Sequence, residues 1–337
     1  MRYKLYTLKF STPVHFADAD FGGDLDKSSI TCSADTYFNA LCFEASQRSV
    51  DLFKTLIDKF TQKRLRISSL FPYYKNDTVD DVQFYLPKPC NIIDKMDELS
   101  SYSEQKQYHN QLKKADKEKF IRVSKLKSWL KSTTTTNILD IVNPIFAIKT
   151  TNNKVSCRQE ESLPYFVGSY QFSKNAGLYF IVGFEDDSDI DFIEPIIERL
   201  GYSGIGGKKS SGYGKYSFGE DPWELDEKFA FYQDDLILYK MLNTKNARFM
   251  AITPIIPELS DIRFMALTGT YNLFKRSGYI YDKNTHIKLR KNDVYMIAEG
   301  SLLLEKIKGT LLKEEYDKIS YPIYRYGMGM FVGIDYE

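Results

Sequence analysis

The residues best suited to chemistry lie in one glycine-rich segment, 201–219. It reads GYSGIGGKKSSGYGKYSFG and holds seven of the nineteen glycines, three lysines and no acidic residue. Glycine permits positive φ and close backbone approach to a ligand, and successive N–H groups of such a loop can form an anion-binding concavity. With lysine charge nearby, the pattern predicts phosphate contact. A flexible surface loop is the alternative, although loops of this length without function are uncommon in compact domains.

Two nucleotide-binding motifs fail on this segment. The P-loop pattern GxxxxGK(S/T) fails because Lys208 is followed by Lys209. A dinucleotide fingerprint built on Gly204 and Gly206 would need a third glycine at position 209. The segment therefore suits an extended phosphodiester backbone better than a single triphosphate. The loop residues expected to contact it are Gly204, Gly206, Gly207, Lys208, Lys209, Ser210, Ser211, Gly212, Tyr213 and Gly214.

Metal and disulfide chemistry has little support in the sequence. The four cysteines form no CxxC pair and the three histidines lie far apart, which argues against a zinc site or a disulfide framework. The acidic loop holds Asp18, Asp20, Asp24 and Asp26, but it lacks the fifth and twelfth ligands of an EF-hand counted from Asp18. No metal and no cofactor are expected.

The overall charge hides a strong segregation. The chain has 337 residues, 46 Lys+Arg against 45 Asp+Glu, and a net charge of +1, which excludes a uniformly basic nucleic-acid binder. Segment 113–131, however, carries eight basic residues against two acids, while acids gather in 18–26, 185–198 and 220–235. The 25 Tyr and 23 Phe could fill a core or stack on bases.

The N-terminal two thirds of the chain predict a strand and helix order typical of a ferredoxin-like unit. Residues 1–10 alternate as a strand, and Phe38, Leu41, Cys42 and Ala45 form the apolar stripe of a helix that Ser33 could cap. The later strands are predicted at 70–74 and 84–89, as short strands or edge segments, at 178–184, as a buried strand, and at 213–218. Between the last two lies a helix with Ile193, Ile196, Ile197 and Leu200 on its apolar face. Pro195 falls in the first turn of this helix, which ends at Gly201.

Two further features interrupt that unit. Residues 94–131 are expected to be a charged helix inside an insertion, 94–137, that is either solvated or in contact with nucleic acid or a partner. The pair Asn152-Asn153 lies between β-prone runs and predicts a hairpin turn. That hairpin would carry Lys149, Lys154 and Arg158.

We place a domain boundary in the acidic stretch 220–235, giving domains 1–220 and 221–337. The second begins with a strand at 248–256 and contains aromatic-basic segments around Lys275, Arg276 and Arg325. These cations could contact nucleic acid, with packing against another subunit as the alternative. The expected fold class is α+β, with a ferredoxin-like first unit that contains a helical insertion and a β-hairpin, followed by a second, smaller α+β domain. No signal peptide or apolar spanning segment is evident, so we expect a cytoplasmic chain.

Several segments together resemble a known family. Gly204–Tyr216 is similar to the glycine-rich signature of the RAMP superfamily of CRISPR proteins. The segments PVHF at 13–16, TYFNALC at 36–42, LFPYY at 70–74, YLPKP at 85–89, YNLFKRSGYIY at 271–281 and YPIYRYGMGMFVGI at 321–334 resemble, in order, those of the Csm-type fourth subunit of type III-A effector complexes.

The resemblance implies two ferredoxin-like (RRM-like) domains, with a helical insertion and a β-hairpin thumb in the first. It also implies a non-catalytic subunit that binds the 5′ tag of the CRISPR RNA, and contact of Lys275, Arg276 and Arg325 with RNA would fit this role. The subunit would cap the filament of backbone subunits and bind the large polymerase/cyclase-like subunit. It would contact target RNA only indirectly, and it would not contact a membrane. The glycine loop would hold the RNA backbone beside His15, and the hairpin would be the family's thumb, which wedges into the guide–target duplex. The acidic loop 18–26 departs from this picture.

Two alternatives stay open. Some members of the superfamily cleave RNA, and here His15 could act as a general base, while Asp24 or Asp26 could assist a metal. The rival to a binding subunit is a metal-independent endoribonuclease of that superfamily that processes precursor CRISPR RNA. A lone histidine is more often structural. The chain could also be a generic RNA-binding protein outside any complex.

Overall fold

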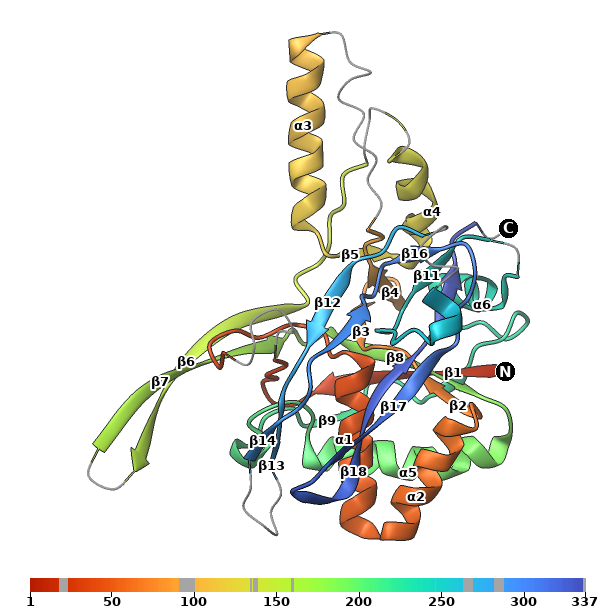
Figure 1. Cartoon of the computed structure of the whole chain (residues 1–337). Coiled ribbons are helices and arrows are strands. Elements are labelled where there is room, and N and C mark those ends of the chain that lie inside the picture. Colours follow the sequence, from red (N-terminus) through yellow and green to blue (C-terminus); the bar gives the residue numbers. More distant parts are fainter. Residues whose placement is uncertain are drawn as a thin grey trace.

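The computed structural model describes residues 1–17, 24–90, 101–133, 135, 139–158, 161–245, 247–262, 269–281 and 288–335. For strand residues 156–158, 161, 162, 281 and 320 only the backbone is described. The architecture is α+β with antiparallel sheets, as predicted (Figure 1).

One central sheet organises the N-terminal two thirds. Its strand order is β10-β1-β8-β3-β4-β5, while β2 pairs with β8 and β9 pairs with β1. The predicted first strand and the predicted buried strand at 178–184 are confirmed, and every residue of the latter, in β8, is buried. The bounds are β1 Arg2–Phe10, β2 Leu65–Ile67, β3 Phe71–Asn76, β4 Asp81–Pro87, β5 Phe120–Arg122, β8 Ala176–Phe184, β9 Tyr216–Phe218 and β10 Trp223–Glu224.

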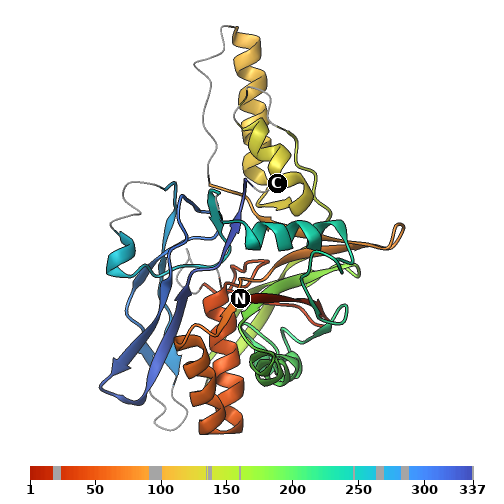
Figure 2. The same ribbon diagram turned by 90° about the vertical axis from the view of Figure 1, so that its right-hand side faces the viewer.

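Helices cover both faces of this sheet, which explains why β8 is buried throughout. The helices α1 (Ala34–Arg48), α2 (Val50–Thr61) and α5 (Asp187–Ser203) lie on one face, and α4 (Val123–Ser132) and α6 (Gln233–Asn243) lie on the other (Figures 1 and 2). Successive side chains of a strand point to opposite faces. The apolar stripe predicted for α1 is confirmed, because Phe38, Leu41, Cys42 and Ala45 are all buried.

Some predicted helix details are wrong. The helix α5 begins at Asp187, where Asp186 and Asp189 form a capping box, so Pro195 lies inside the helix and not in its first turn. It continues past Gly201 to Ser203, and Gly204 at φ 80° follows as the C-cap. Of the two alternatives predicted for 70–74, a short strand or an edge segment, the structure shows the short strand β3, which pairs with β4 on one side and β8 on the other.

The predicted continuous helix over 94–131 is also wrong. The helix α3 spans Tyr102–Lys117, and β5 then pairs with β4 before α4 begins at Val123. The apolar residues around Ile121 fit a helix as well as a strand. Residues 120–122 form a strand because they pair with the open edge of β4. Residues 91–100 lie outside the described part. In Figure 1, α3 stands away from the rest of the molecule.

The predicted hairpin exists, but its turn is elsewhere. The strands β6 (Ala147–Arg158) and β7 (Glu161–Phe172) pair along their whole length and reach out from the body (Figure 1). Asn152 and Asn153 lie in the middle of β6, opposite Val167 and Phe166. Without a glycine that favours positive φ, this dipeptide continues the strand between its β-prone neighbours.

The C-terminal part contains several small antiparallel sheets. The strand β11 lies between β16 and β19, and the other strands form the pairs β12-β15, β13-β14 and β17-β18. The expected strand at 248–256 is shorter than predicted. The bounds are β11 Phe249–Ala251, β12 Leu273–Arg276, β13 Tyr279–Tyr281, β14 Lys288–Arg290, β15 Val294–Ile297, β16 Leu302–Leu303, β17 Gly309–Tyr316, β18 Ile319–Met328 and β19 Phe331–Gly333.

The two predicted domains share their core. The second face of the central sheet, with Leu5 and Tyr179, packs in one apolar cluster with Met241, Met250 and Met330. In addition, β10 lies beyond residue 220 and pairs with β1. The boundary near residue 220 therefore crosses a packed interface, and the division into domains 1–220 and 221–337 stays a prediction.

Candidate nucleic-acid interface

The glycine-rich segment connects α5 to β9 and contains one short 3-10 turn, Lys209–Ser211. Most of its amides are engaged inside the protein. The N–H groups of residues 204, 205, 207 and 211–214 each donate to a backbone carbonyl, among them Gly207 to His15 at 2.8 Å and Gly214 to Pro13 at 2.8 Å. Those amides are thus not directed at a ligand as the anion-binding expectation required. The amides of Gly207 and Gly214 fasten the loop to segment 13–15, and the other five bond to α5 or within the loop.

Close packing explains the glycines at the centre of this loop. Gly206 has φ 84°, and a Cβ there would lie 2.5 Å from the carbonyl oxygen of His15. A Cβ on Gly207 would lie 2.6 Å from Cδ2 of the same histidine ring. Real contacts of this kind are not that short, so glycine is required for the loop to cover His15.

His15 joins the glycine loop to the hairpin. Its side chain is 3% exposed, and Nδ1 donates to the carbonyl of Gly168 on β7 at 2.7 Å. The neighbouring Val14 exchanges two backbone hydrogen bonds with Tyr170, both 2.9 Å. The expectation that His15 lies beside the loop is confirmed. Its ring holds the loop and the base of the hairpin together.

One lysine of the loop lies over an aromatic ring of the hairpin, and one lysine of the hairpin lies over an aromatic ring of the loop. Lys208 Nζ lies 4.7 Å from the ring centre of Tyr165 on β7, and Lys154 Nζ on β6 lies 5.1 Å from that of Tyr213 in the loop. Asn152 Nδ2 also donates to the hydroxyl of Tyr213 at 3.2 Å. These contacts place positive charge along the seam between hairpin and loop. On the same hairpin Lys149 is exposed, and the side chain of Arg158 lies outside the described part.

A cavity of about 460 Å³ opens beside the loop. It lies between α1, the glycine loop and the C-terminal strands, so segments far apart in sequence meet there. The predicted residues on its wall are Gly206, Gly207, Lys209, Arg276 and Arg325, and residues that sequence reasoning missed are Asp35, Thr36, Asn39, Phe43, Tyr279 and Lys291.

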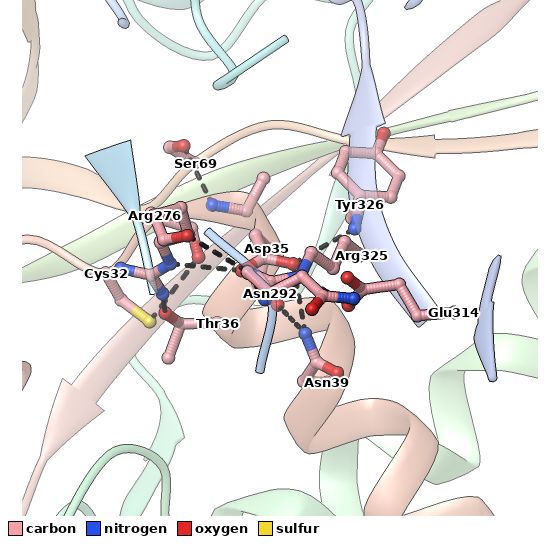
Figure 3. Close-up of polar contacts among 12 residues, drawn as sticks. Cys32, Asp35, Thr36, Asn39, Ser69, Arg276, Asn292, Glu314, Arg325 and Tyr326 are labelled. Atoms are coloured by element: carbon pink, nitrogen blue, oxygen red, sulfur yellow. Dashed lines mark hydrogen bonds and ion pairs between the residues drawn. The ribbon is translucent and has the colours of Figure 1, made fainter. Parts of the chain in front are cut away.

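Asp35 holds the edge of this cavity (Figure 3). It is 4% exposed, and its Oδ2 accepts from Arg276 Nε at 3.2 Å. Its Oδ1 accepts from the backbone N–H of Tyr326 and from Asn39 Nδ2, both at 3.0 Å. Arg276 also donates to the hydroxyl of Thr36. The carboxylate therefore fixes β12 and β18 against the first turn of α1, and it positions the Arg276 guanidinium at the cavity.

Arg325 lies deeper in the same cluster. Its side chain is 1% exposed, and Nε pairs with Glu314 Oε2 at 2.6 Å (Figure 3). Its Nη1 donates to the backbone carbonyl of Arg276 at 3.3 Å. The charge of Arg325 is thus compensated within the fold, and its RNA contact stays a prediction.

Lys291 supplies a cation that no sequence pattern marks. Burial lowers the pKa of its amine, and so does repulsion by Arg325 and Arg276, while Asp35 and Glu314 oppose the shift. It follows directly after β14 among other charged residues, so nothing in its local sequence distinguishes it from a solvated lysine. The three-dimensional cluster alone shows that it faces the cavity.

A second cavity of about 510 Å³ adjoins the first and shares Ala17, Thr36 and Arg276 with it. Its far wall includes Lys88 and Lys119 at the base of the insertion. The remaining predicted cation, Lys275, lies on neither wall. It is half exposed and pairs with Asp293 at 3.6 Å.

The remaining sequence predictions concern the acidic loop, metal sites, the cysteines and membrane-spanning segments. Asp24 and Asp26 are described, whereas Asp18 and Asp20 lie outside the described part. Within the described residues, no three His, Cys, Asp or Glu side chains gather as a metal site would require. The described Cys32, Cys42 and Cys90 are free thiols. Among the described helices, none is long and apolar enough to span a membrane.

The chain is similar in sequence to known CRISPR proteins. Residues 244–334 match the family model of the CRISPR Csm4 C-terminal domain. The chain is 26% identical over 340 residues to the CRISPR system Cms protein Csm4 of Streptococcus thermophilus, covering 99% of this chain and 100% of that protein. It is 25% identical over 337 residues to the protein of that name from Mycobacterium tuberculosis H37Rv, covering 99% and 98%.

Solved structures agree at the level of the fold. A chain in the crystal structure of a Csm3-Csm4 subcomplex of the type III-A interference complex superimposes with a TM-score of 0.61 at 18% identity, covering 99% of both chains. A chain in a Csm1-Csm4 cassette bound to cA4 gives a TM-score of 0.58 at 18% identity, covering 100% of this chain and 99% of that chain. Along nearly its whole length, the chain resembles the fourth Csm subunit, Csm4, of type III-A CRISPR effector complexes.

Proposed function

We propose that the chain is a non-catalytic RNA-binding subunit of a type III-A CRISPR complex, one that binds the 5′ tag of the CRISPR RNA. The observation that carries this proposal is the cavity of about 460 Å³ at which the glycine loop, with its Lys209, meets Arg276 and Lys291. Cations in a concave surface attract phosphates, and exposed aromatic side chains can stack on unpaired bases. Phe43 and Tyr279 on the same wall are 39% and 59% exposed.

The arrangement of the central sheet supports a ferredoxin-like first domain within this proposal. The elements β1, α1, β3, β8, α5 and β9 follow in the order β-α-β-β-α-β, with both helices on one face of an antiparallel sheet. The hairpin β6-β7 would be the thumb and the region around α3 the insertion. We extend the ferredoxin-like assignment to the C-terminal part as a proposal only.

The partners follow from the similar proteins. The structures that the chain resembles are described as complexes of Csm4 with Csm1 and with Csm3. We propose that this chain likewise links a large, Csm1-like subunit to Csm3-like backbone subunits in antiviral defence. The target RNA would meet the chain indirectly, through the duplex that it forms with the guide.

The geometry of His15 favours binding over catalysis. A general base must reach the proton that it removes, but this ring is buried, its Nδ1 is engaged by Gly168, and the backbone of Gly207 packs against Cδ2. The rival function is an endoribonuclease that processes precursor CRISPR RNA. Incubating the purified chain with labelled repeat RNA separates the two. We expect binding without cleavage, and site-specific cleavage that is lost on His15→Ala would overturn the proposal.

The RNA contact is tested through its salt dependence. Replacing Lys208 and Lys209 together by alanine should weaken binding of tag RNA and reduce the slope of log affinity against log salt by between about one and two. The matched control is Lys54→Ala on α2, an exposed lysine away from the cavity, which should leave the slope unchanged. An unchanged slope in the double variant would mean that the loop does not contact phosphates.

Assembly is tested separately from RNA binding. Co-expression with a Csm1-like and a Csm3-like subunit should yield a complex that co-purifies through several columns. RNA binding without any co-purification would instead favour a generic RNA-binding protein outside a complex.

A further inference from the structure

The helix α3 carries three lysines in one row on its exposed side. Lys106, Lys113 and Lys117 are all exposed, and at 3.6 residues per turn they fall within about 40° of one another around the helix axis. The row is about 16 Å long, because an α-helix rises by about 1.5 Å per residue. Tyr108 and Ala115, on the opposite side of the helix, are 1% and 4% exposed. We call the three lysines the basic ridge.

No acidic residue neutralises the basic ridge. Within the described part of the chain, none of its three amines forms an ion pair with a carboxylate. Asp116 instead pairs with Lys88 at 3.2 Å, and Asp140 pairs with Lys114 at 3.5 Å. Like charges one turn apart, as in this ridge, destabilise a helix, and acids placed between them would stabilise it. A bound anion would relieve the same repulsion.

The composition of this side of α3 favours a phosphate backbone over an acidic protein surface. The exposed side chains beside the ridge are His109, Asn110 and Lys114, and none of them is apolar. A protein–protein interface usually has an apolar core inside a polar rim, which these residues do not supply. Phosphates, by contrast, are bound by lysine together with polar side chains such as asparagine.

An aromatic ring extends the ridge and points to a single strand. Tyr102 is 80% exposed and precedes Lys106 by one helical turn, so the two side chains lie on the same side of α3. Proteins bind single-stranded nucleic acid with cations that follow the backbone and aromatic rings that stack on the bases. A base inside a duplex is already stacked and paired, so it is not available to this ring.

The ridge lies outside the two cavities but is connected to them. The helix α3 projects from the body (Figure 1), and Lys119, two residues after its end, lies on the wall of the cavity of about 510 Å³. That cavity shares Arg276 with the cavity of about 460 Å³ beside the glycine loop. An RNA strand that leaves the cavities on this side therefore passes the base of α3.

We propose that the basic ridge and Tyr102 form a second RNA site, which binds the backbone of single-stranded RNA independently of its sequence. The ridge lysines contact successive phosphates, and the tyrosine ring stacks on one unpaired base. The inference goes beyond the proposed function, which concerns the tag site at the cavities, and either site can exist without the other.

The experiment measures binding of the purified full-length chain to labelled oligouridine by fluorescence anisotropy at several salt concentrations. Lys106→Gln, Lys113→Gln and Lys117→Gln together preserve helix propensity. They should reduce the slope of log affinity against log salt by about two, because each phosphate contact of a single strand contributes about 0.7. Tyr102→Ala should weaken binding at least about fivefold and leave the slope unchanged, since stacking on a base displaces no counterion.

The matched control removes three exposed lysines elsewhere, by Lys54→Gln, Lys228→Gln and Lys318→Gln, and should leave the slope unchanged. An equal loss of slope in both triple variants would reduce the effect to net charge and overturn the inference. An unchanged slope in the ridge variant, or tighter binding of duplex RNA than of oligouridine, would also overturn it. Polyglutamate that binds through the ridge as tightly as oligouridine would indicate an acidic protein partner instead.

The tag site is measured separately with tag RNA. Lys208→Ala with Lys209→Ala should weaken binding of tag RNA, while the ridge substitutions should still lower the oligouridine slope in that background. If the ridge effect is present but the loop lysines do not affect tag RNA, only the proposed function fails. If the loop lysines matter for tag RNA but the ridge substitutions leave the oligouridine slope unchanged, only this inference fails.

Discussion

At the scale of single residues, two glycines of one loop allow a controlled experiment. Gly206 and Gly212 have nearly the same φ, 84° and 85°. A Cβ on Gly206 would clash with the His15 carbonyl at 2.5 Å, whereas nothing lies within 4 Å of one on Gly212. Gly212→Ala should cost only the strain of a left-handed alanine, about 1–2 kcal/mol. Gly206→Ala should cost clearly more, and denaturant unfolding measures the difference. Equal effects would mean that the loop does not pack on His15.

Lys291 should reduce stability while it serves binding. Its pKa is lowered by burial, so the folded chain releases this proton at lower pH than the unfolded chain. Between the lowered pKa and the ordinary value near 10.5, the unfolded chain binds more protons, and the contribution of Lys291 to stability rises with pH. Lys291→Met should therefore raise the melting temperature at neutral pH. It should also abolish the increase of stability with pH in that interval, and it should weaken binding of tag RNA. A variant that loses RNA affinity and stability alike would contradict this.

At the scale of elements, Asp35 joins three segments that are distant in sequence. It fixes the first turn of α1 to Arg276 on β12 and to the backbone of β18. Removing one partner of a buried pair leaves a buried charge, which costs about 3–5 kcal/mol. Asp35→Ala should lower the free energy of unfolding by that amount. The matched control, Glu315→Ala, breaks the exposed pair with Lys313 and should have a much smaller effect. Similar effects of both substitutions would show that the cluster does not hold the strands.

Elements with a strong local pattern could be predicted from the sequence, and those decided by pairing could not. The stripe of α1 and the apolar run of β8 need no distant information, and both predictions are confirmed. The strand β5 exists because β4 offers an open edge, and the hairpin turn lies beyond Asn152 because β7 pairs along the whole of β6. The cavity residues Asp35 and Lys291 come together only through tertiary contacts, so no spacing in the sequence reveals them.

At the scale of the whole molecule, the predicted boundary near residue 220 crosses a shared core. The sheet face with Leu5 and Tyr179 is covered by Met241 and Met250, and β10 completes the edge of the same sheet. Burial of apolar surface is the main favourable term in folding. A fragment that ends at residue 220 would expose that face. Sequence composition placed the boundary in an acidic stretch, but composition does not show which side of a sheet needs a cover.

We therefore expect the full-length chain to unfold as one cooperative unit. Urea unfolding followed by Trp fluorescence and by far-UV circular dichroism should give coincident transitions, because Trp129 and Trp223 both lie in the shared cluster. The fragment 1–220 expressed alone should be aggregation-prone, since Leu5, Tyr179 and Ile181 would lose their apolar neighbours. Co-expression with fragment 221–337 should restore solubility. Two separated transitions, or a soluble and cooperatively folded fragment 1–220, would show instead that the halves are independent domains and that the shared cluster is a weak interface.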